Sequence, residues 1–401
     1  MVRTFLRPIK LAVFSLLPVV ALFLAAETAV RLSHLDRPAL YAGGFGSIDK
    51  NDSGELADVD LGWSGKPGYR KAASFSQEAY REAYNFNSLG LRSPEVAPKR
   101  ETELRVLSLG ESSTMGIGVE AEDTYSMRLQ ELLGQSLRPR PVTVINAGIS
   151  GYSSFQSLKY LELRGLKLKP DLVLFYHELN DYMPSTIRDP GESEVEILQT
   201  DKQLYDSRLV RLSRWFLARS ALYRFASYSY AQRRIRKLII TPGQGSQEVK
   251  SPLEEIGLPG KYNQTALPYH LSEGGGRKSA TEILPAAIGR RVTNEERLDN
   301  LRRLVTVCRE NGITLVIMHP SYAWTARHEC LLTRFCAENH VPMFETYDIL
   351  HAAGTMLELK FLDYMHPSPA GHRALAEGLS RFILDMLNMR ADRRMIESVP
   401  C

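Results

Sequence analysis

The chain has 401 residues, of which 44% are hydrophobic and 24% charged, and its formal net charge is +4. This composition is typical of a folded protein and excludes a disordered chain, and so small a charge at this length does not indicate nucleic-acid binding. The length allows one large core with an insertion, or two domains.

An apolar segment lies near the start of the chain. Basic residues precede an uncharged run at 11–26, and Glu27 and Arg31 can snorkel and extend it to Leu32. A cleaved signal peptide is the alternative, but no Ala-x-Ala cleavage site occurs between residues 21 and 30. We therefore predict an uncleaved single-pass anchor within 1–36. Because positive charge precedes the span, the remaining chain is expected outside the cytoplasm.

Residues 37–100 are rich in Gly, Ser and Asp and predict short strands and turns. Strands and helices then alternate over 101–184 and 291–395, which predicts a parallel sheet covered on both faces. The expected strands are 104–110, 142–148, 171–177, 313–318 and 342–344. The expected helices are 124–133, 157–166, 294–311, 326–338 and 370–387.

An insertion at 185–290 interrupts this alternation. Its part 204–240 predicts amphipathic basic helices, with the basic residues gathered between 208 and 237, and 241–285 reads as loop. We favour a solvated face for the basic helices. The alternative is a collar that lies against anionic headgroups or an acidic polymer.

The cysteines would face an oxidising compartment if this topology holds. Their spacing gives neither a disulfide framework nor a set of metal ligands, and we expect no metal and no cofactor. The cysteines are Cys308, Cys330, Cys336 and Cys401.

The first expected strand, 104–110, ends at a glycine and is followed by Ser112. Open α/β sheets build their sites at the carboxyl ends of strands, although a serine there is also an ordinary helix cap. Near the other end of the chain, Asp363 precedes His366 by three positions, and the prolines that follow keep the histidine in a loop. Ser, His and Asp are the parts of an activated nucleophile. A surface histidine beside an Asx-turn is the alternative for this last pair.

Two further strand ends offer donors for a developing negative charge. Gly151 follows the second expected strand and lets a backbone N–H approach a substrate, and Asn180 follows the third with a side-chain amide. Each alone is explained by turn chemistry. The order Ser, Gly, Asn and Asp-x-x-His at successive loops favours a shared site.

In this order the residues resemble the SGNH (GDSL-type) hydrolases, whose four blocks carry Ser, Gly, Asn and His. The blocks correspond to 110–114, 146–151, 180–181 and 363–366. The resemblance implies a three-layer α/β/α sandwich with a mostly parallel, five-stranded, flavodoxin-like sheet. Two elements near the amino terminus, Asp60-Leu61-Gly62-Trp63 and an Asn-x-x-Gly-x-Arg at 87–92, are similar to those of a membrane-anchored bacterial subgroup.

The resemblance also implies a role for each site residue. Ser112 is the expected nucleophile, His366 the base and Asp363 the residue that orients the base. The expected oxyanion donors are the backbone N–H groups of Ser112 and Gly151 and the amide of Asn180.

The sequence departs from the family pattern at two positions. Glu111 stands where the family usually has Asp, and Glu178 stands where it usually has Gly. The Glu178 carboxylate either repels charge in the oxyanion hole or points away into the helix layer.

The function expected is that of a membrane-anchored, extracytoplasmic serine esterase or acylhydrolase acting on an acyl ester, for which a cell-envelope glycan or lipid is a plausible carrier. One alternative is an O-acyltransferase that modifies an envelope glycan with the same residues. Another is a non-catalytic envelope or polysaccharide-binding protein that keeps the fold.

Overall fold

The computed structural model describes part of the chain, namely residues 2–33, 54–58, 60–70, 74–75, 81–82, 85–182, 185–188, 194–197, 200–205, 220–222, 225–226, 291–323, 330–352, 360–362 and 365–397. Most of the basic segment predicted at 208–237 and all of the loop predicted at 241–285 lie outside these residues, as do Asp363 and Cys401. The domain boundaries expected from the sequence stay predictions.

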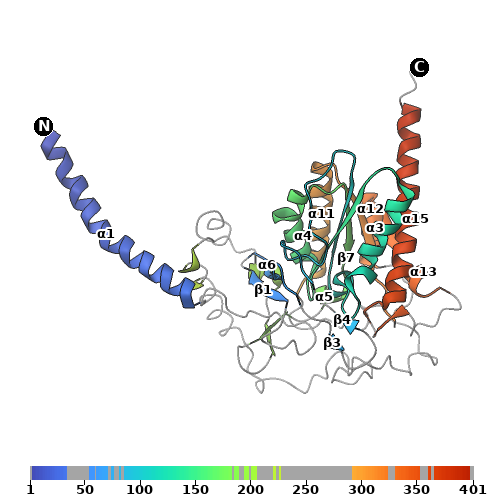
Figure 1. The fold of residues 1–401 in the computed structure, drawn as a ribbon, viewed down its shortest axis with the longest axis horizontal. Helices are drawn as coiled ribbons and strands as arrows, with labels where there is room; N and C mark the ends of the chain where they lie inside the picture. Colours follow the sequence, from blue (N-terminus) through green and yellow to red (C-terminus); the bar gives the residue numbers. More distant parts are fainter. Residues whose placement is uncertain are drawn as a thin grey trace.

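A five-stranded parallel sheet forms the centre of the molecule (Figure 1), in the order β11-β10-β7-β5-β6. Counted from its first strand in the chain, this is the flavodoxin-like order, and it confirms the predicted sheet. The order reverses beside β5, and in such sheets ligands bind outside the carboxyl ends of the strands at that reversal. The strands are β5 (Leu104–Gly110), β6 (Val142–Gly148), β7 (Leu172–Tyr176), β10 (Thr314–His319) and β11 (Met343–Glu345).

Both faces of the sheet are covered, and β5 and β7 are buried at every position. Because side chains alternate along a strand, Leu107 and Leu109 enter one core cluster while Leu104 and Val106 enter the other. The first cluster lies under α4 (Ser154–Leu163), α11 (Asn294–Glu310) and α12 (Leu331–Asn339), and the second under α3 (Tyr125–Ser136) and α15 (Pro369–Glu397).

Side-chain caps set the starts of the main helices. The Thr124 hydroxyl accepts from the Met127 backbone at the start of α3. Ser153 forms a capping box with Gln156, which starts α4 three residues before the predicted position. Thr293 does the same at α11, and the glycine after that helix has a φ of 66°, as expected of a helix end.

The amino-terminal segment forms the single helix α1 (Val2–Ser33), which extends away from the body in Figure 1. Its window Leu16–Ser33 has a mean hydropathy of 1.7, long and apolar enough to cross a membrane, and a signal sequence passes the same test. Glu27, near the end of this window, pairs with Arg31 at 2.7 Å and accepts the backbone N–H of Ala221 at 2.8 Å. The anchor itself stays a prediction.

The described part of 37–100 packs onto the sheet domain. Leu61 and Trp63 belong to the same core cluster as Leu107 and Leu109 of β5. The Trp63 indole also donates to the carbonyl of Ser150 at 2.9 Å. The Asp-x-Gly-Trp element therefore supports the loop that carries Gly151.

Short elements complete the described residues. The hairpins pair β1 (Glu55–Asp58) with β2 (Gly62–Gly65), β3 (Ser74–Phe75) with β4 (Arg81–Glu82) and β8 (Ser185–Arg188) with β9 (Glu194–Ile197). The short helices are α2 (Ser112–Met115), η1 (Ala121–Asp123), η2 (Gly165–Leu168), α5 (Leu179–Tyr182), α6 (Asp201–Tyr205) and α13 (Tyr347–Leu350).

Candidate active site

Ser112 is the first residue of α2, and a single residue, Glu111, separates it from the end of β5. The turn is tight, because a Cβ atom at Gly110 would lie 1.9 Å from the hydroxyl oxygen of Thr114. A Cβ atom at Gly148 would lie 2.3 Å from the backbone nitrogen of Met115. Glycine at both positions therefore lets α2 rest on the ends of β5 and β6, which fixes the serine at the edge of the sheet.

His366 faces this serine. Its Nε2 atom lies 2.9 Å from the Ser112 Oγ, and the two residues are 7% and 5% exposed. A second contact joins the same two loops, since the Ser113 hydroxyl donates to the carbonyl of Met365 at 3.4 Å. A hydroxyl in hydrogen-bond contact with an imidazole nitrogen is the arrangement of a nucleophile and its base. Asp363 lies outside the described residues, so its role stays a prediction.

The loops that carry Gly151 and Asn180 also meet. The Asn180 amide donates to the carbonyl of Tyr152 at 3.1 Å, next to Gly151. Gly151 has a φ of 72°, in the left-handed region that favours glycine, and a Cβ atom there would lie 3.3 Å from the Trp63 ring. The structure thus brings two of the predicted donors to neighbouring positions. Their convergence on one oxyanion with the Ser112 N–H stays a prediction.

A buried arginine that no sequence pattern predicted supports the Gly151 loop. Arg291 donates to the Gly151 carbonyl and, at 2.5 Å, to the side-chain oxygen of Gln156. Its guanidinium also forms a 2.8 Å ion pair with Asp201, with side chains 5% and 2% exposed. The Trp63 ring lies 5.5 Å from the guanidinium carbon. These contacts fix the carbonyl side of the Gly151 turn.

A second buried arginine supports the serine turn. Arg92, the last residue of the Asn-x-x-Gly-x-Arg element, is fully buried and donates to the carbonyls of Met115, Gly116 and Val119. These carbonyls lie at and beyond the end of α2, where a planar guanidinium satisfies several acceptors at once. The element therefore positions the segment that carries the nucleophile.

Glu111 precedes the nucleophile and is 2% exposed. Burial, with a smaller contribution from the Asp181 charge, raises the pKa of Glu111 to about 8, although the backbone N–H of Asn180 donates to its carboxyl group. Glu111 therefore links the serine turn to the asparagine turn and is largely protonated at neutral pH.

Glu178 lies toward the helix layer, the second of the two positions considered from the sequence. Its carboxylate is 3.9 Å from the guanidinium of Arg297, on α11. Arg297 also lies 3.3 Å from the carboxylate of Asp181, which accepts the backbone N–H of Ser154 at 2.7 Å. A cation shared between two carboxylates lowers the negative potential that Glu178 would otherwise add near the site.

A second histidine, His372, lies in the first turn of α15 and has a different role. His372 is fully buried, and its Nδ1 accepts the backbone N–H of Tyr125 at 3.1 Å. Burial lowers the pKa of His372 to about 3, so the ring is a neutral acceptor at the start of α3. Of the two histidines, only His366 contacts Ser112.

No family model matches the chain, and no curated protein matches its sequence. At low identity the fold resembles solved esterases of the SGNH/GDSL type. The acetylxylan esterase Axe2 from Geobacillus stearothermophilus is 15% identical, with a TM-score of 0.37 over 70% of this chain and 94% of that one. The esterase EstA from Pseudoalteromonas sp. is 14% identical, with a TM-score of 0.36 over 71% of this chain and 98% of that one. The α/β hydrolase LAE5 from the metagenome of Lake Arreo is 14% identical, with a TM-score of 0.38 over 70% of this chain and 94% of that one. At these values the likeness assigns neither a family nor an activity.

Proposed function

We propose that the chain is a serine esterase or acylhydrolase whose nucleophile is Ser112 and whose general base is His366. The observation that carries the proposal is the 2.9 Å contact between the Ser112 Oγ and the His366 Nε2 at the carboxyl edge of a parallel sheet. A serine hydroxyl is a weak nucleophile at neutral pH unless a base accepts its proton.

The chemistry follows from this pair. The Ser112 Oγ attacks the acyl carbon of an ester while the His366 Nε2 accepts the hydroxyl proton. The tetrahedral intermediate then expels the alcohol, which receives that proton from the imidazolium. A water molecule, deprotonated by His366, then attacks the acyl-serine. The bond to the Ser112 Oγ breaks, the imidazolium returns the proton to that oxygen, and the carboxylic acid is released. In this proposal Asp363 accepts the other imidazole N–H and holds the ring in the required tautomer.

Negative charge develops on the ester carbonyl oxygen during both attacks. We assign its stabilisation to the backbone N–H groups of Ser112 and Gly151 and to the Asn180 amide. Support comes from the 3.1 Å contact of that amide with the residue after Gly151, which keeps the two loops together. Preorganised donors of this kind lower the barrier because they need no rearrangement as charge appears.

The proposed location is the outer face of a membrane, with α1 as an uncleaved anchor. Three basic residues precede the apolar part of this helix, and this charge bias favours a cytoplasmic amino terminus. An ester-bearing glycan or lipid of the cell envelope would lie within reach of a domain held there.

A fluorophosphonate probe tests the nucleophile directly, because it phosphonylates only activated serines. Wild-type protein should be labelled, and peptide mapping should place the adduct on Ser112. Ser112→Ala should lose both labelling and turnover of p-nitrophenyl acetate. Ser113→Ala is the matched control. Ser113 is the neighbouring buried serine, but its hydroxyl donates to the Met365 carbonyl, whereas the Ser112 hydroxyl contacts His366. Equal labelling of wild type and Ser112→Ala would overturn the proposal.

A further inference from the structure

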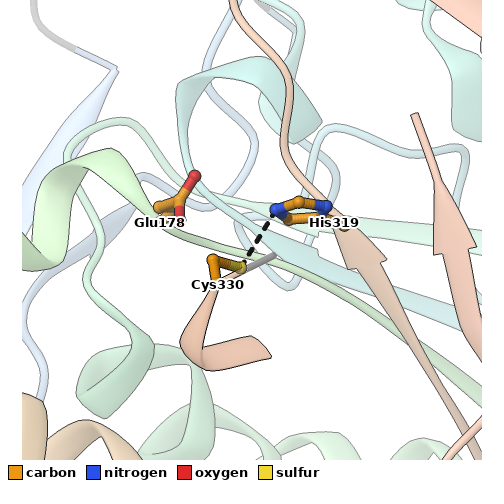
Figure 2. Close-up of side chains that lie close together, drawn as sticks. All are labelled: Glu178, His319 and Cys330. Atoms are coloured by element: carbon orange, nitrogen blue, oxygen red, sulfur yellow. Dashed lines mark hydrogen bonds between the residues drawn. The ribbon is translucent and has the colours of Figure 1, made fainter. Parts of the chain in front are cut away.

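A second cluster of reactive side chains lies at the same edge of the sheet, outside the proposed triad. Glu178 follows β7, His319 ends β10 and Cys330 directly precedes α12. Their residues are 1%, 3% and 6% exposed. One carboxylate oxygen, one ring nitrogen and the sulfur all lie within 4.8 Å of one another. Figure 2 shows the three side chains converging from separate segments of the chain.

The orientation of His319 is set by a fourth residue. Its Nδ1 lies 2.7 Å from a carboxylate oxygen of Glu345, at the end of β11, and its Nε2 lies 3.2 Å from the Cys330 sulfur. The carboxylate accepts the Nδ1–H, which leaves Nε2 directed at the cluster. Histidines that bind metals are held in the same way, by a carboxylate on the ring nitrogen that does not face the metal.

Glu178 supplies an independent observation. Neither of its carboxylate oxygens has a hydrogen-bond partner among the described residues, although the side chain is almost fully buried. The Arg297 guanidinium, 3.9 Å away, donates its hydrogen bonds to Tyr182 and to the carbonyl of His177 instead. Burying a carboxylate is costly unless it is paired, hydrogen-bonded or bound to a metal. Within the described part of the chain, the carboxylate thus has an ion-pair contact but no hydrogen bond, and one of its oxygens lies within 4.8 Å of both the thiol sulfur and the imidazole nitrogen.

We propose that Glu178, His319 and Cys330 form a zinc site, with a carboxylate oxygen, the imidazole Nε2 and the thiolate as its three protein ligands. This mixed set of oxygen, nitrogen and sulfur suits Zn²⁺, whereas Mg²⁺ and Ca²⁺ prefer oxygen ligands alone. Two anionic ligands neutralise the dication, and the proton between His319 and Cys330 leaves as the metal enters.

The distances require only small movements. Tetrahedral bonds of about 2.3 Å to sulfur and about 2.0 Å to nitrogen place neighbouring ligand atoms roughly 3.5 Å apart. The Nε2 and sulfur atoms, now 3.2 Å apart, would separate slightly, and the Glu178 oxygen already lies within 4.8 Å of both. The bound ion would link the segments that follow β7, end β10 and precede α12. One of its ligands, Glu178, lies two residues before Asn180 in the chain.

Cobalt(II) tests the site because it replaces zinc and reports its ligands by absorption. The full chain, purified in detergent and stripped with a chelator, should bind one Co²⁺. It should then show a thiolate-to-cobalt band in the near ultraviolet and the visible bands of four-coordinate cobalt, and Zn²⁺ should abolish both. Thermal unfolding should shift upward with Zn²⁺, as expected for a ligand that binds the folded state.

Variants separate the ligands from their surroundings. Cys330→Ser should lose the near-ultraviolet band and Glu178→Gln should weaken binding, whereas Cys308→Ser, a buried thiol on α11 outside the cluster, should keep the wild-type spectrum. Glu345→Gln should weaken affinity by about 10- to 100-fold while keeping the bands.

The proposal is overturned if wild-type protein shows no such bands, or if Cys330→Ser keeps them. Rapid alkylation of Cys330 without any cobalt spectrum would instead indicate a thiol activated by His319, and would also overturn it. The cobalt spectrum of the wild-type protein tests the site even if one of the variants fails to fold. Because none of these measurements uses ester turnover, their outcome is independent of the proposed esterase activity.

Discussion

The His366 Nε2 lies 2.9 Å from the Ser112 Oγ, although 254 positions separate the two residues in the chain. Two packed elements bring them together. α2 rests on the ends of β5 and β6, and α15, which begins three residues after His366, packs in the same core cluster as α3 through Leu375 and Leu379. The relative positions of the two side chains therefore depend on the main core, and the described part of the insertion supplies neither of them.

The Asn180 amide is the most direct test of the proposed oxyanion site. Asn180→Ala should lower kcat by about 10²- to 10³-fold, the cost of removing one preorganised donor, with a smaller change in KM. Steady-state kinetics on p-nitrophenyl acetate measure both constants.

Asn300→Ala is the matched control for this variant. Asn300 is also buried, but its amide contacts the Ser154 hydroxyl between α11 and α4, so its loss should affect stability and leave kcat close to that of the wild type. A kcat for Asn180→Ala within a factor of two or so of the control would argue against a role in charge stabilisation.

The strands were the most predictable part of the fold. The expected bounds 104–110 and 142–148 coincide with β5 and β6, because each is an apolar or β-branched run that stops at a glycine. The end of the last helix was predicted ten residues too early, at 387. Beyond it the chain has few apolar residues but many good helix formers and no breaker, and α15 continues to Glu397.

For the site, the order of residue types along the chain, together with the family resemblance that it suggested, led us to expect Ser112 and His366 in one site, and the structure places the two side chains in contact. The supporting contacts were not predictable, because they join segments whose spacing carries no pattern. Arg291 reaches Gly151 across 140 positions. The three proposed zinc ligands follow β7, end β10 and precede α12, so no sequence spacing connects them. Arg92 stood in a recognised element, but only its three carbonyl contacts reveal what it does.

The ion pair between Arg291 and Asp201 should matter for stability and for the Gly151 loop. Arg291→Leu leaves a buried, uncompensated carboxylate, and breaking such a pair costs about 3–5 kcal/mol. Urea unfolding should report this loss, and kcat should fall as the Gly151 carbonyl loses its donor. Arg291→Leu combined with Asp201→Leu should recover part of the stability without recovering kcat. If the double variant is as unstable as the sum of the two single variants, the pair is not coupled.

Glu111 should make the folded protein less stable as the pH rises. Its folded pKa of about 8 lies above the ordinary value of 4.5. Between these values the folded state holds a proton that the unfolded state releases, so this group's stabilisation is complete below pH 4.5 and is lost as the pH rises to about 8. Glu111→Gln keeps a neutral side chain of the same shape and should not lose this stability. The free energy of unfolding of the wild type should therefore fall more steeply than that of the variant, by up to about 1.4 kcal/mol per pH unit. Urea unfolding over this range measures the difference, and parallel curves for the two proteins would contradict the assignment.

His372 should act in the opposite direction. Burial lowers its folded pKa to about 3 from the ordinary 6.5, so its contribution is present above pH 6.5 and is lost as the pH falls toward 3. His372→Asn retains an acceptor for the Tyr125 N–H but cannot take up a proton, so its free energy of unfolding should fall less steeply on acidification. Urea unfolding between those two pH values measures both slopes. Equal slopes would mean that His372 is not a neutral buried acceptor.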